Sequence, residues 1–336
     1  MNVLGIESSC DETSVAVICN NELKANLISS QDFHKKYGGV VPELSSRAHL
    51  QIVTPLIRDA LDKASLSKEE IDLVTATAGP GLIGALLVGL TFGKGLAYSL
   101  NKSFIAVNHI EGHIYSGFLM EEKPEFPYLA LVVSGGHTLL LLVKSHTEIR
   151  KLGSTVDDAA GEAFDKVAKM LGFGYPGGPK IQKASENGEN SEINFPVADL
   201  KDPFNFSFSG LKTSVLRFIQ KNFNDGLIPE IDKNKIAYSF QKAVAKALIR
   251  NSEKALKTFE VKSISLVGGV AANGFIRNSL IELANHFNKK IIIPKIEFCG
   301  DNAAMIAYRG QKLFENGIFH GWDYAPFPSM PENQYN

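Results

Sequence analysis

Hydrophobic and polar positions alternate at the start of the chain, as they do in strands that are buried on one face. Three alternating runs, NVLGIES, SVAVICN and ELKANLISS, are separated by polar turns and predict three strands. A helical period follows over residues 46–64, and its apolar face carries Leu50, Val53, Leu56, Ile57 and Leu61. The Ser-x-x-Glu capping box that begins at Ser67 predicts a helix N-terminus.

The alternation of strands and helices continues to about residue 125. IDLVTATAGPG predicts a buried strand and a tight turn before a glycine-rich helix, and SFIAVNHIEGH predicts another strand that leads into a helix. The glycine-rich stretch is the most apolar in the chain, but its glycines and Lys94 favour a buried helix over a membrane span. This order of elements predicts a layered α/β fold.

A second α/β half begins near residue 126, where YLALVVSGGHTLLLLVK repeats the opening pattern of strand, small polar turn and strand. We interpret this as a structural duplication that divides the chain into residues 1–125 and 126–336. A helix is predicted over 159–171 and a loop over GFGYPGGPK. Residues from about 180 to 260 are mostly helical and polar, as expected of an insert, and the second half resumes with the strand of SISLVGGVAANG.

Composition supports a globular protein of about two domains, because the chain has 336 residues, of which 44% are hydrophobic and 21% charged. The net charge of −1 means that any nucleic-acid contact must come from a local patch. Three cysteines without a CxxC pair indicate a reducing compartment and exclude a cysteine-built zinc site. The N-terminus lacks the basic region of a signal peptide, so we expect a cytoplasmic protein without a membrane anchor.

Three turns of small residues, at 5–14, 133–138 and 268–274, share the ability to bind an anionic group. Each offers backbone N–H groups and little side-chain bulk at the end of a strand. A single turn of this kind is weak evidence, but three of them across two duplicated halves point to a bound anion. The chain has neither a Walker A motif nor a Rossmann GxGxxG after the first strand, which excludes the commonest nucleotide cradles.

His109 and His113 are four residues apart, so on a helix they project from one face, as two ligands of one metal ion must. An isolated pair with this spacing is more often structural. A metallopeptidase HExxH motif would place a glutamate directly after the first histidine. Here Ile110 has that place, and Glu111 falls on the opposite face from His109, so a peptidase would lack its general base.

Eight motifs resemble the TsaD (Gcp) family from end to end. In chain order they are GIESSCDETSVAVI, GPGLIGALLVGLTFGKGLA, NHIEGHIYS, LVVSGGHT, GEAFDKVAKMLGFGYPGGP, SFSGLKTSV, VGGVAANGFIR and CGDNAAMIA. The histidine of SGGHT is similar to the bacterial branch. The resemblance implies the two-lobed fold of the actin/Hsp70/sugar-kinase (ASKHA, ribonuclease H-like) superfamily. It also implies transfer of threonylcarbamoyl from threonylcarbamoyl-AMP, with release of AMP, to N6 of the adenosine just 3′ of the anticodon in tRNAs that read codons beginning with A.

The resemblance also maps a metal site onto His109, His113 and Asp301, which provide two nitrogens and one oxygen. Archaeal relatives add a tyrosine just before their VSGG, where this chain has Val132, so we expect substrate or water as the fourth ligand. The ligand set suits both iron(II) and zinc. We expect one divalent ion per subunit, with iron(II) ahead of zinc.

Catalytic and substrate-binding residues follow from the same resemblance. An aspartate on a polar turn is usually only a turn residue. Here the poorly nucleophilic amine of adenosine calls for an activated donor and a base, and Asp11 is the candidate base, with Glu12 as the second. The implied adenylate contacts are Val132, Val133, Ser134, Gly135, Gly136, Asp165, Gly178 and Asn273. Gln182 stands where many relatives have an aspartate, so it is a weaker candidate.

A basic stripe runs along the insert, where Lys242, Lys246, Arg250 and Lys254 recur every four residues. The opposite side of the same helix carries Phe240, Val244 and Leu248. Such a stripe is usually a solvated face. A tRNA substrate favours phosphate contacts instead, because these supply most of the affinity that does not depend on sequence.

Three rival functions remain at this point: a metabolite kinase or ATPase of the same superfamily, a metallopeptidase, and a scaffold subunit without catalysis. The histidine pair fits a kinase poorly, and the position of Glu111 argues against a peptidase. The resemblance implies tRNA as substrate and three partner proteins: a TsaB-like shorter paralogue, a TsaE-like ATPase, and the upstream enzyme that makes threonylcarbamoyl-AMP.

Overall fold

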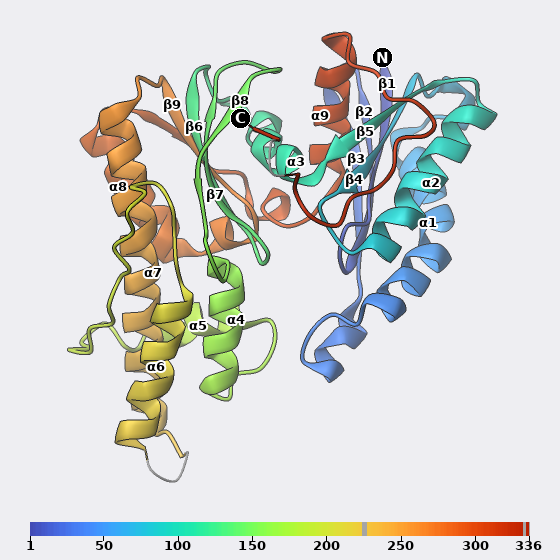
Figure 1. Cartoon of the computed structure of the whole chain (residues 1–336). Helices are drawn as coiled ribbons and strands as arrows, with labels where there is room; N and C mark the ends of the chain where they lie inside the picture. The colour runs from blue at the N-terminus through green and yellow to red at the C-terminus, as the bar shows by residue number, and fades with distance from the viewer. Residues whose placement is uncertain (224–226, 332–333, 336) are drawn as a thin grey trace. The chain divides into compact units, whose positions relative to one another are not determined.

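The computed structural model describes residues 1–223, 227–331 and 334–335, without the side chain of Lys35. The chain forms two compact units (Figure 1). Unit 1 consists of Met1–Lys123, His146–Glu148 and the C-terminal stretch from Gly300, and unit 2 consists of Pro124–Ser145 and Ile149–Cys299. The boundary near residue 125 was predicted, but the return of the chain into unit 1 was not. Helix α9 (Ala303–Glu315) packs on the first strands of the chain, which is why the C-terminal stretch belongs there.

Unit 1 is built on a five-stranded sheet with the order β3-β2-β1-β4-β5. Its strands are β1 (Asn2–Glu7), β2 (Glu12–Cys19), β3 (Glu22–Ser30), β4 (Leu73–Gly79) and β5 (Ser103–Asn108). The first three strands are antiparallel neighbours, whereas β4 and β5 are parallel to β1. The predicted hairpin at the start of the chain and the strands of IDLVTATAGPG and SFIAVNHIEGH are thus confirmed.

Helices cover both faces of this sheet. They are α1 (Pro42–Ala64), α2 (Ile83–Ser99), α3 (His109–Ser116) and α9. Leu4 and Ile6 of β1 share a core with residues of α1 and α2, whereas a methyl group at Gly5 would lie 2.5 Å from the Ala303 carbonyl oxygen of α9. Because neighbouring side chains of a strand point to opposite faces, α9 lies on the face away from α1 and α2.

Two details of α1 and its surroundings differ from the sequence-based prediction. Leu50, expected on the apolar face of α1, is 68% exposed. The capping box at Ser67 begins only a single 3₁₀ turn, η2 (Lys68–Glu70), although the Glu70 carboxylate accepts the Ser67 N–H at 2.8 Å as the motif requires. Three residues further on the chain enters β4, so no helix can follow.

The stretch after α9 is tied to α2 and to the turn that precedes it. Lys94 of α2 donates to the carbonyl oxygens of Trp322, at 2.8 Å, and Tyr324. The Phe327 N–H donates to the Ala78 carbonyl, and the Gly81 N–H donates to the Pro328 carbonyl. The C-terminal stretch therefore supports the turn between β4 and α2.

Unit 2 repeats the topology of unit 1, which confirms the duplication. Its sheet has the order β10-β9-β6-β7-β8, with antiparallel pairing of β6 to β7 and β7 to β8 and parallel pairing of β9 to β6 and β10. The strands are β6 (Tyr128–Val133), β7 (Thr138–Val143), β8 (Ile149–Ser154), β9 (Ser263–Val267) and β10 (Lys290–Ile292). In order of pairing, β6 to β10 correspond to β1 to β5.

The helices of unit 2 include the predicted insert. They are α4 (Ala160–Met170), α5 (Gly177–Ser185), α6 (Ser209–Asn222), α7 (Glu230–Thr258) and α8 (Gly274–His286). The helix predicted over 159–171 is α4. The expected loop GFGYPGGPK is a loop only up to Pro176, because α5 begins at Gly177. Short 3₁₀ turns complete the chain: η1 (Asp32–Tyr37), η3 (Gly117–Leu119), η4 (Gly269–Ala272) and η5 (Ile296–Phe298).

Candidate functional site

Two capped helix ends in unit 1 bring the predicted metal ligands together. Asn108 ends β5 and caps α3, because its side-chain oxygen accepts the N–H groups of Ile110 and Glu111. Asn302 caps α9 in the same way through the N–H of Met305. His109 is therefore the first residue of α3, and Asp301 directly precedes the cap of α9.

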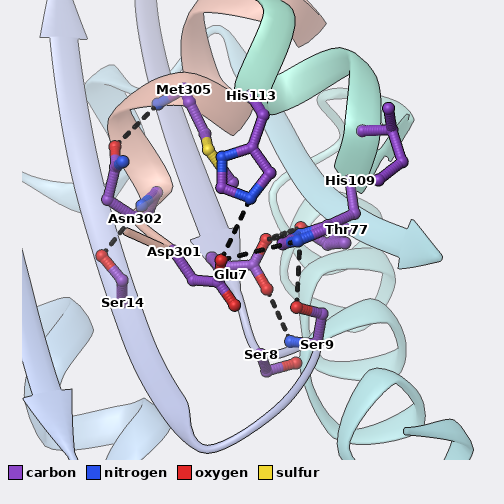
Figure 2. Close-up of polar contacts among 12 residues, drawn as sticks. Glu7, Ser8, Ser9, Ser14, Thr77, His109, His113, Asp301, Asn302 and Met305 are labelled. Carbon is purple, nitrogen blue, oxygen red and sulfur yellow. Dashed lines mark hydrogen bonds and ion pairs between the residues drawn. The ribbon is translucent and has the colours of Figure 1, made fainter. Parts of the chain in front are cut away.

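A glycine allows these two helices to pack closely. A methyl group at Gly112 would lie 2.7 Å from Ile306 Cδ1 on α9, too close for any larger residue without displacement. His113 follows on the same helix and is fully buried. The close approach of α3 to α9 thus faces both histidines toward Asp301, as Figure 2 shows.

The three side chains have the geometry of a metal site. Nε2 of His109 and Nε2 of His113 lie 3.5 and 3.2 Å from the same oxygen of Asp301, and one donor atom from each residue falls within a 4.8 Å cluster. Both ring nitrogens of His113 are buried without a hydrogen-bond partner, despite the short approach to Asp301. Such a buried polar group is costly unless an ion or another donor satisfies it. Two imidazoles and a carboxylate therefore fit a divalent cation.

Glu7 is a fourth member of this cluster that the sequence analysis did not select. It ends β1 and is fully buried, and its Oε2 lies 3.2 Å from Nδ1 of His109. Burial alone would raise the pKa of Glu7, but the His109 ring and the Thr77 hydroxyl outweigh burial and hold the pKa below its ordinary value. A charged residue at the end of the apolar run NVLGIE was the signal in the sequence.

The charges of the cluster also act on His109. Burial opposes protonation of this ring, but Asp301 and Glu7 raise its pKa to about 9. A positive charge is therefore stabilised at this point of the protein. A divalent cation bound at Nε2 would take the place of the proton on that nitrogen.

Glu111 does not belong to the metal cluster. Its carboxylate accepts hydrogen bonds from Nε and Nη2 of Arg309 at 2.7 and 2.6 Å, and the Arg309 side chain is only 4% exposed. The remaining Arg309 nitrogen donates to the His146 carbonyl, and the guanidinium carbon lies 4.4 Å from the centroid of the Tyr115 ring. A carboxylate engaged in this way is not available as the general base of a peptidase.

The turn that carries Asp11 and Glu12 lies next to the metal cluster. Burial, followed by the negative charge of Asp301, raises the pKa of Glu12 to about 7, and the Ser30 hydroxyl donates to its carboxylate at 3.1 Å. A carboxylate with this pKa is suited to take up a proton near neutral pH. The Asp11 side chain is half-buried on the same turn.

A buried histidine that was not predicted holds this turn in place. His49 of α1 contacts the Cys10 carbonyl through Nε2 at 3.0 Å and the Thr13 hydroxyl through Nδ1 at 2.7 Å. Since a carbonyl can only accept, Nε2 carries the proton and Nδ1 accepts from Thr13. The sequence gives no local signal for this role, because residues 10 and 49 meet only through the packing of α1 on β2.

Unit 2 contains a cavity of about 570 Å³, a size typical of small-ligand sites. Of the predicted adenylate contacts, five line it: Gly135, Asp165, Gly178, Gln182 and Asn273. The other predicted contacts, Val132, Val133, Ser134 and Gly136, are not part of its wall. Val132 and Val133 are completely buried in β6, and the Ser134 hydroxyl accepts the His137 N–H within the turn.

The polar residues of the cavity cap the two helices that begin there. Asp165 accepts the Gly177 N–H at the start of α5 at 2.7 Å, and Asn273 accepts the Ile276 N–H at the start of α8. Gln182 accepts the Gly274 N–H at 3.1 Å. Helix N-termini favour negative charge, and at α5 the Asp165 carboxylate already supplies it, so the part of the wall that suits an anionic ligand is the N-terminus of α8, whose caps are the neutral amides of Asn273 and Gln182.

Gln241 of α7 supports this wall from behind and was not predicted. Its side-chain oxygen accepts from the Asn273 amide at 2.7 Å, and its amide donates to the Ser185 hydroxyl. Gln241 is 1% exposed, so these contacts satisfy a buried amide. They fix Asn273 with its oxygen on the N-terminus of α8.

The basic stripe on α7 is partly occupied by contacts within the protein. Lys242 and Lys246 are exposed, and Phe240, Val244 and Leu248 on the opposite side are fully buried, as predicted. Arg250, however, donates to the Ala198 carbonyl at 2.6 Å and lies 3.8 Å from Asp199. Lys254 is half-buried.

Within the described part of the chain, no helix combines the length and the hydropathy needed to cross a bilayer.

The matching family model and the relatives of highest identity point to one family. The model of the family described as "TsaD: tRNA N6-adenosine threonylcarbamoyltransferase" matches residues 22–308. The enzyme of that name from Thermosipho africanus is 53% identical over 321 residues, which are 95% of this chain and 96% of the relative. Its counterpart from Kosmotoga olearia is 49% identical over 332 residues, 98% of each chain. The crystal structure of HypF from T. kodakarensis has a TM-score of 0.67 at 16% identity, covers 94% of this chain and 48% of its own, and shows the shared actin-like fold. The chain therefore belongs to the tRNA N6-adenosine threonylcarbamoyltransferase (TsaD) family of tRNA-modifying transferases.

Proposed function

We propose that the chain transfers the threonylcarbamoyl group of threonylcarbamoyl-AMP to N6 of the adenosine just 3′ of the anticodon, in tRNAs that read codons beginning with A. One observation carries the choice of donor: the cavity of unit 2 is of nucleotide size and joins the N-termini of α5 and α8. The phosphate of an adenylate suits the N-terminus of α8, whose caps are neutral amides. Asp165 and Asn273 supply the polar groups that orient a ligand in such a cavity.

In this reaction the N6 nitrogen attacks the carbamoyl carbon, the new C–N bond forms, and the C–O bond to phosphate breaks. AMP leaves with the electron pair of that bond, and N6 gives up one proton. The sequence favoured Asp11 as the base, with Glu12 second; we now propose Glu12 first, because a raised pKa of about 7 suits a group that takes up a proton near neutral pH. Asp11 on the same turn is the second candidate.

We propose His109, His113 and Asp301 as ligands of one divalent ion, with iron(II) ahead of zinc. The support is the donor set itself and the two unpartnered nitrogens of His113. When bound, the ion would act as a Lewis acid on an oxygen of the substrate, with substrate or water as a further ligand.

The proposed tRNA contacts on α7 are centred on Lys242 and Lys246, the two exposed cations of the stripe. Arg250 contacts residues 198–199 instead, so we leave it out of the phosphate contacts. Lys254 is half-buried and remains a weaker candidate for a phosphate contact. We propose the cytoplasm as the compartment, since the proposed substrate is tRNA.

We further propose that the protein works with a TsaB-like paralogue and a TsaE-like ATPase, after the enzyme that makes threonylcarbamoyl-AMP. The surface of α1 and α2 supports a protein partner, because Leu50, Ile83 and Leu87 are between 46% and 68% exposed. The two helices are in close contact, since a methyl group at Gly84 would lie 2.4 Å from the Ser46 hydroxyl oxygen.

One reconstitution tests the proposal. The purified protein is incubated with unmodified tRNA, ATP, threonine, bicarbonate, the adenylate-forming enzyme and the two partners, and the nucleosides of the tRNA are analysed. Threonylcarbamoyladenosine is expected only when the protein is present. Asp11→Ala and Glu12→Gln should each lower turnover by about two to four orders of magnitude. Glu43→Gln, an exposed carboxylate of unit 1, is the matched control. Wild-type turnover in both site variants would remove the proposed base, and absence of the product would refute the reaction.

A further inference from the structure

Glu7 combines full burial with a negative charge, which needs a compensating partner. It is 0% exposed, at the end of a strand whose other residues are almost entirely apolar. Moving an ionised carboxylate out of water costs several kcal/mol unless hydrogen bonds and an opposite charge offset the loss. The fold already satisfies its oxygens in part, because the Ser9 N–H donates to Oε1 at 2.5 Å and the Thr77 hydroxyl donates to Oε2 at 2.6 Å. Both donors are neutral, so neither balances the charge.

The remaining contact of Glu7 is with His109, and it determines how that ring is used. Oε2 of Glu7 lies 3.2 Å from Nδ1, whereas Nε2 on the other side of the ring faces Asp301 at 3.5 Å (Figure 2). An ionised carboxylate can only accept a hydrogen bond, so Nδ1 carries a proton. The lone pair of a neutral ring is then on Nε2, which points into the proposed metal site. The Ser9 hydroxyl, 3.2 Å from Nδ1, can accept from the same N–H.

The sum of the charges in the cluster also favours a bound cation. Among the groups that contact the two imidazoles, Glu7 and Asp301 are the carboxylates, and together they bring two negative charges. Two neutral histidines add none. A divalent cation therefore balances the pair, and without Glu7 the same ion would leave one positive charge buried beside His113.

We propose that Glu7 is a positioning residue of the metal centre, which keeps Nδ1 of His109 protonated, directs Nε2 to the ion and supplies the second balancing charge. This inference rests on the metal site proposed above for His109, His113 and Asp301. In metal sites, a carboxylate that accepts from a ligating histidine typically contributes 10- to 100-fold in affinity.

The test measures zinc binding rather than activity. The full-length protein is freed of metal with a chelator and titrated with Zn²⁺ against a chromophoric competitor, and the same is done for Glu7→Gln. The amide keeps the shape and one acceptor but loses the charge, so zinc should bind about 10- to 100-fold more weakly. Glu22→Gln is the matched control, because it neutralises another carboxylate of the same unit that pairs with Lys24 and not with His109. Its zinc affinity should stay within about threefold of wild type.

A second measurement does not depend on the folding of a variant. In the zinc-loaded wild type, ¹⁵N NMR of the histidine rings should show His109 coordinated through Nε2, with a protonated Nδ1 that exchanges slowly with water. Coordination through Nδ1, or equal zinc affinity of Glu7→Gln and wild type, would overturn the role of Glu7 and leave the metal centre in place. A wild-type protein that takes up no zinc would overturn both.

Discussion

The buried pair of Glu111 and Arg309 allows a quantitative prediction for Glu111→Ala. Removal of the carboxylate leaves the guanidinium, 4% exposed, with the His146 carbonyl and the Tyr115 ring as its neighbours. Breaking a buried pair from one side costs about 3–5 kcal/mol. Glu111 itself is 14% exposed, so some water can reach the stranded cation, and we expect the lower end, about 3 kcal/mol. For domains of 150–250 residues this corresponds to a fall in Tm of about 6–12 °C.

The single tryptophan of the chain makes the assay specific to unit 1. Trp322 belongs to this unit and packs on Phe104, so its fluorescence follows the unfolding of unit 1 in urea. A double-mutant cycle compares Glu111→Ala, Arg309→Met and the variant that carries both substitutions. Since the double variant no longer contains a stranded charge, its loss of unfolding free energy should be smaller than the sum of the single losses by about 2 kcal/mol. A loss below about 1 kcal/mol for Glu111→Ala, or additive losses, would refute the reasoning.

Three further predictions concern the proposed sites. The double variant His109→Ala/His113→Ala should contain no stoichiometric metal by elemental analysis while its circular dichroism spectrum stays that of the wild type; full occupancy would contradict the ligand set. The kcat/KM of the wild type should rise with pH as Glu12 loses its proton, because only the ionised carboxylate can act as a base; a cation bound to Asp301 would move this rise below pH 7, and a profile that is flat from pH 5 to 8 would exclude Glu12. Lys242→Ala/Lys246→Ala should flatten the dependence of log Kd for tRNA on log salt by about 0.7–0.9 for each phosphate that the variant no longer neutralises, with adenylate affinity unchanged; an unchanged slope would return α7 to a solvated face.

The pH dependence of stability has the opposite sign to that of activity for Glu12. Its pKa is raised from 4.5 to about 7 in the folded protein, so between these values the folded state holds a proton that the unfolded state has released. The contribution of Glu12 to the free energy of unfolding is therefore largest below pH 4.5 and is lost as the pH rises toward 7. Urea midpoints of the metal-free wild type and the metal-free Glu12→Gln variant should therefore diverge over this interval, and parallel curves would contradict the raised pKa.

The sequence predicted those helices and strands whose hydrophobic residues follow a clear local pattern. The alternation of SVAVIC and the run YLALVV identify β2 and β6, because each strand buries most of its side chains. β8 was missed, since Ile149–Ser154 is a polar edge strand with one buried residue. The return of the chain into unit 1 was also missed, because the packing of Gly5 on Ala303 joins residues that are almost the whole chain apart and leaves no local pattern.

For the candidate site, too, the sequence predicted features set by local spacing but not contacts between distant elements. The spacing of His109 and His113 predicted their common face, but only the family resemblance connected them with Asp301. Glu7, His49 and Gln241 act through contacts between distant elements, so their roles could not be derived from spacing. Arg250 is a case in which a local pattern predicted too much. Its four-residue spacing made it a candidate phosphate contact like Lys242 and Lys246, but its hydrogen bond to the Ala198 carbonyl separates it from them.

The discontinuity of unit 1 has a consequence for how the protein is made. Unit 2 lies within residues 124–299, so all of it has been synthesised while α9 is still missing from unit 1. During synthesis the sheet of β1 to β5 therefore has α1 and α2 on one face, but the face that α9 covers remains open. Because domains generally fold as units as they leave the ribosome, unit 2 is expected to fold before the unit that contains the N-terminus.

Asp301 is synthesised after β1 and after all of unit 2. Only a chain that has been synthesised through α9 can therefore hold Asp301 beside His109 and His113. A ribosome that stalls between Cys299 and Asp301 would release a product with the whole of unit 2 and its cavity but an incomplete cation site. If assembly follows this order, such fragments should remain bound to nascent-chain chaperones in the cell and should contain no metal.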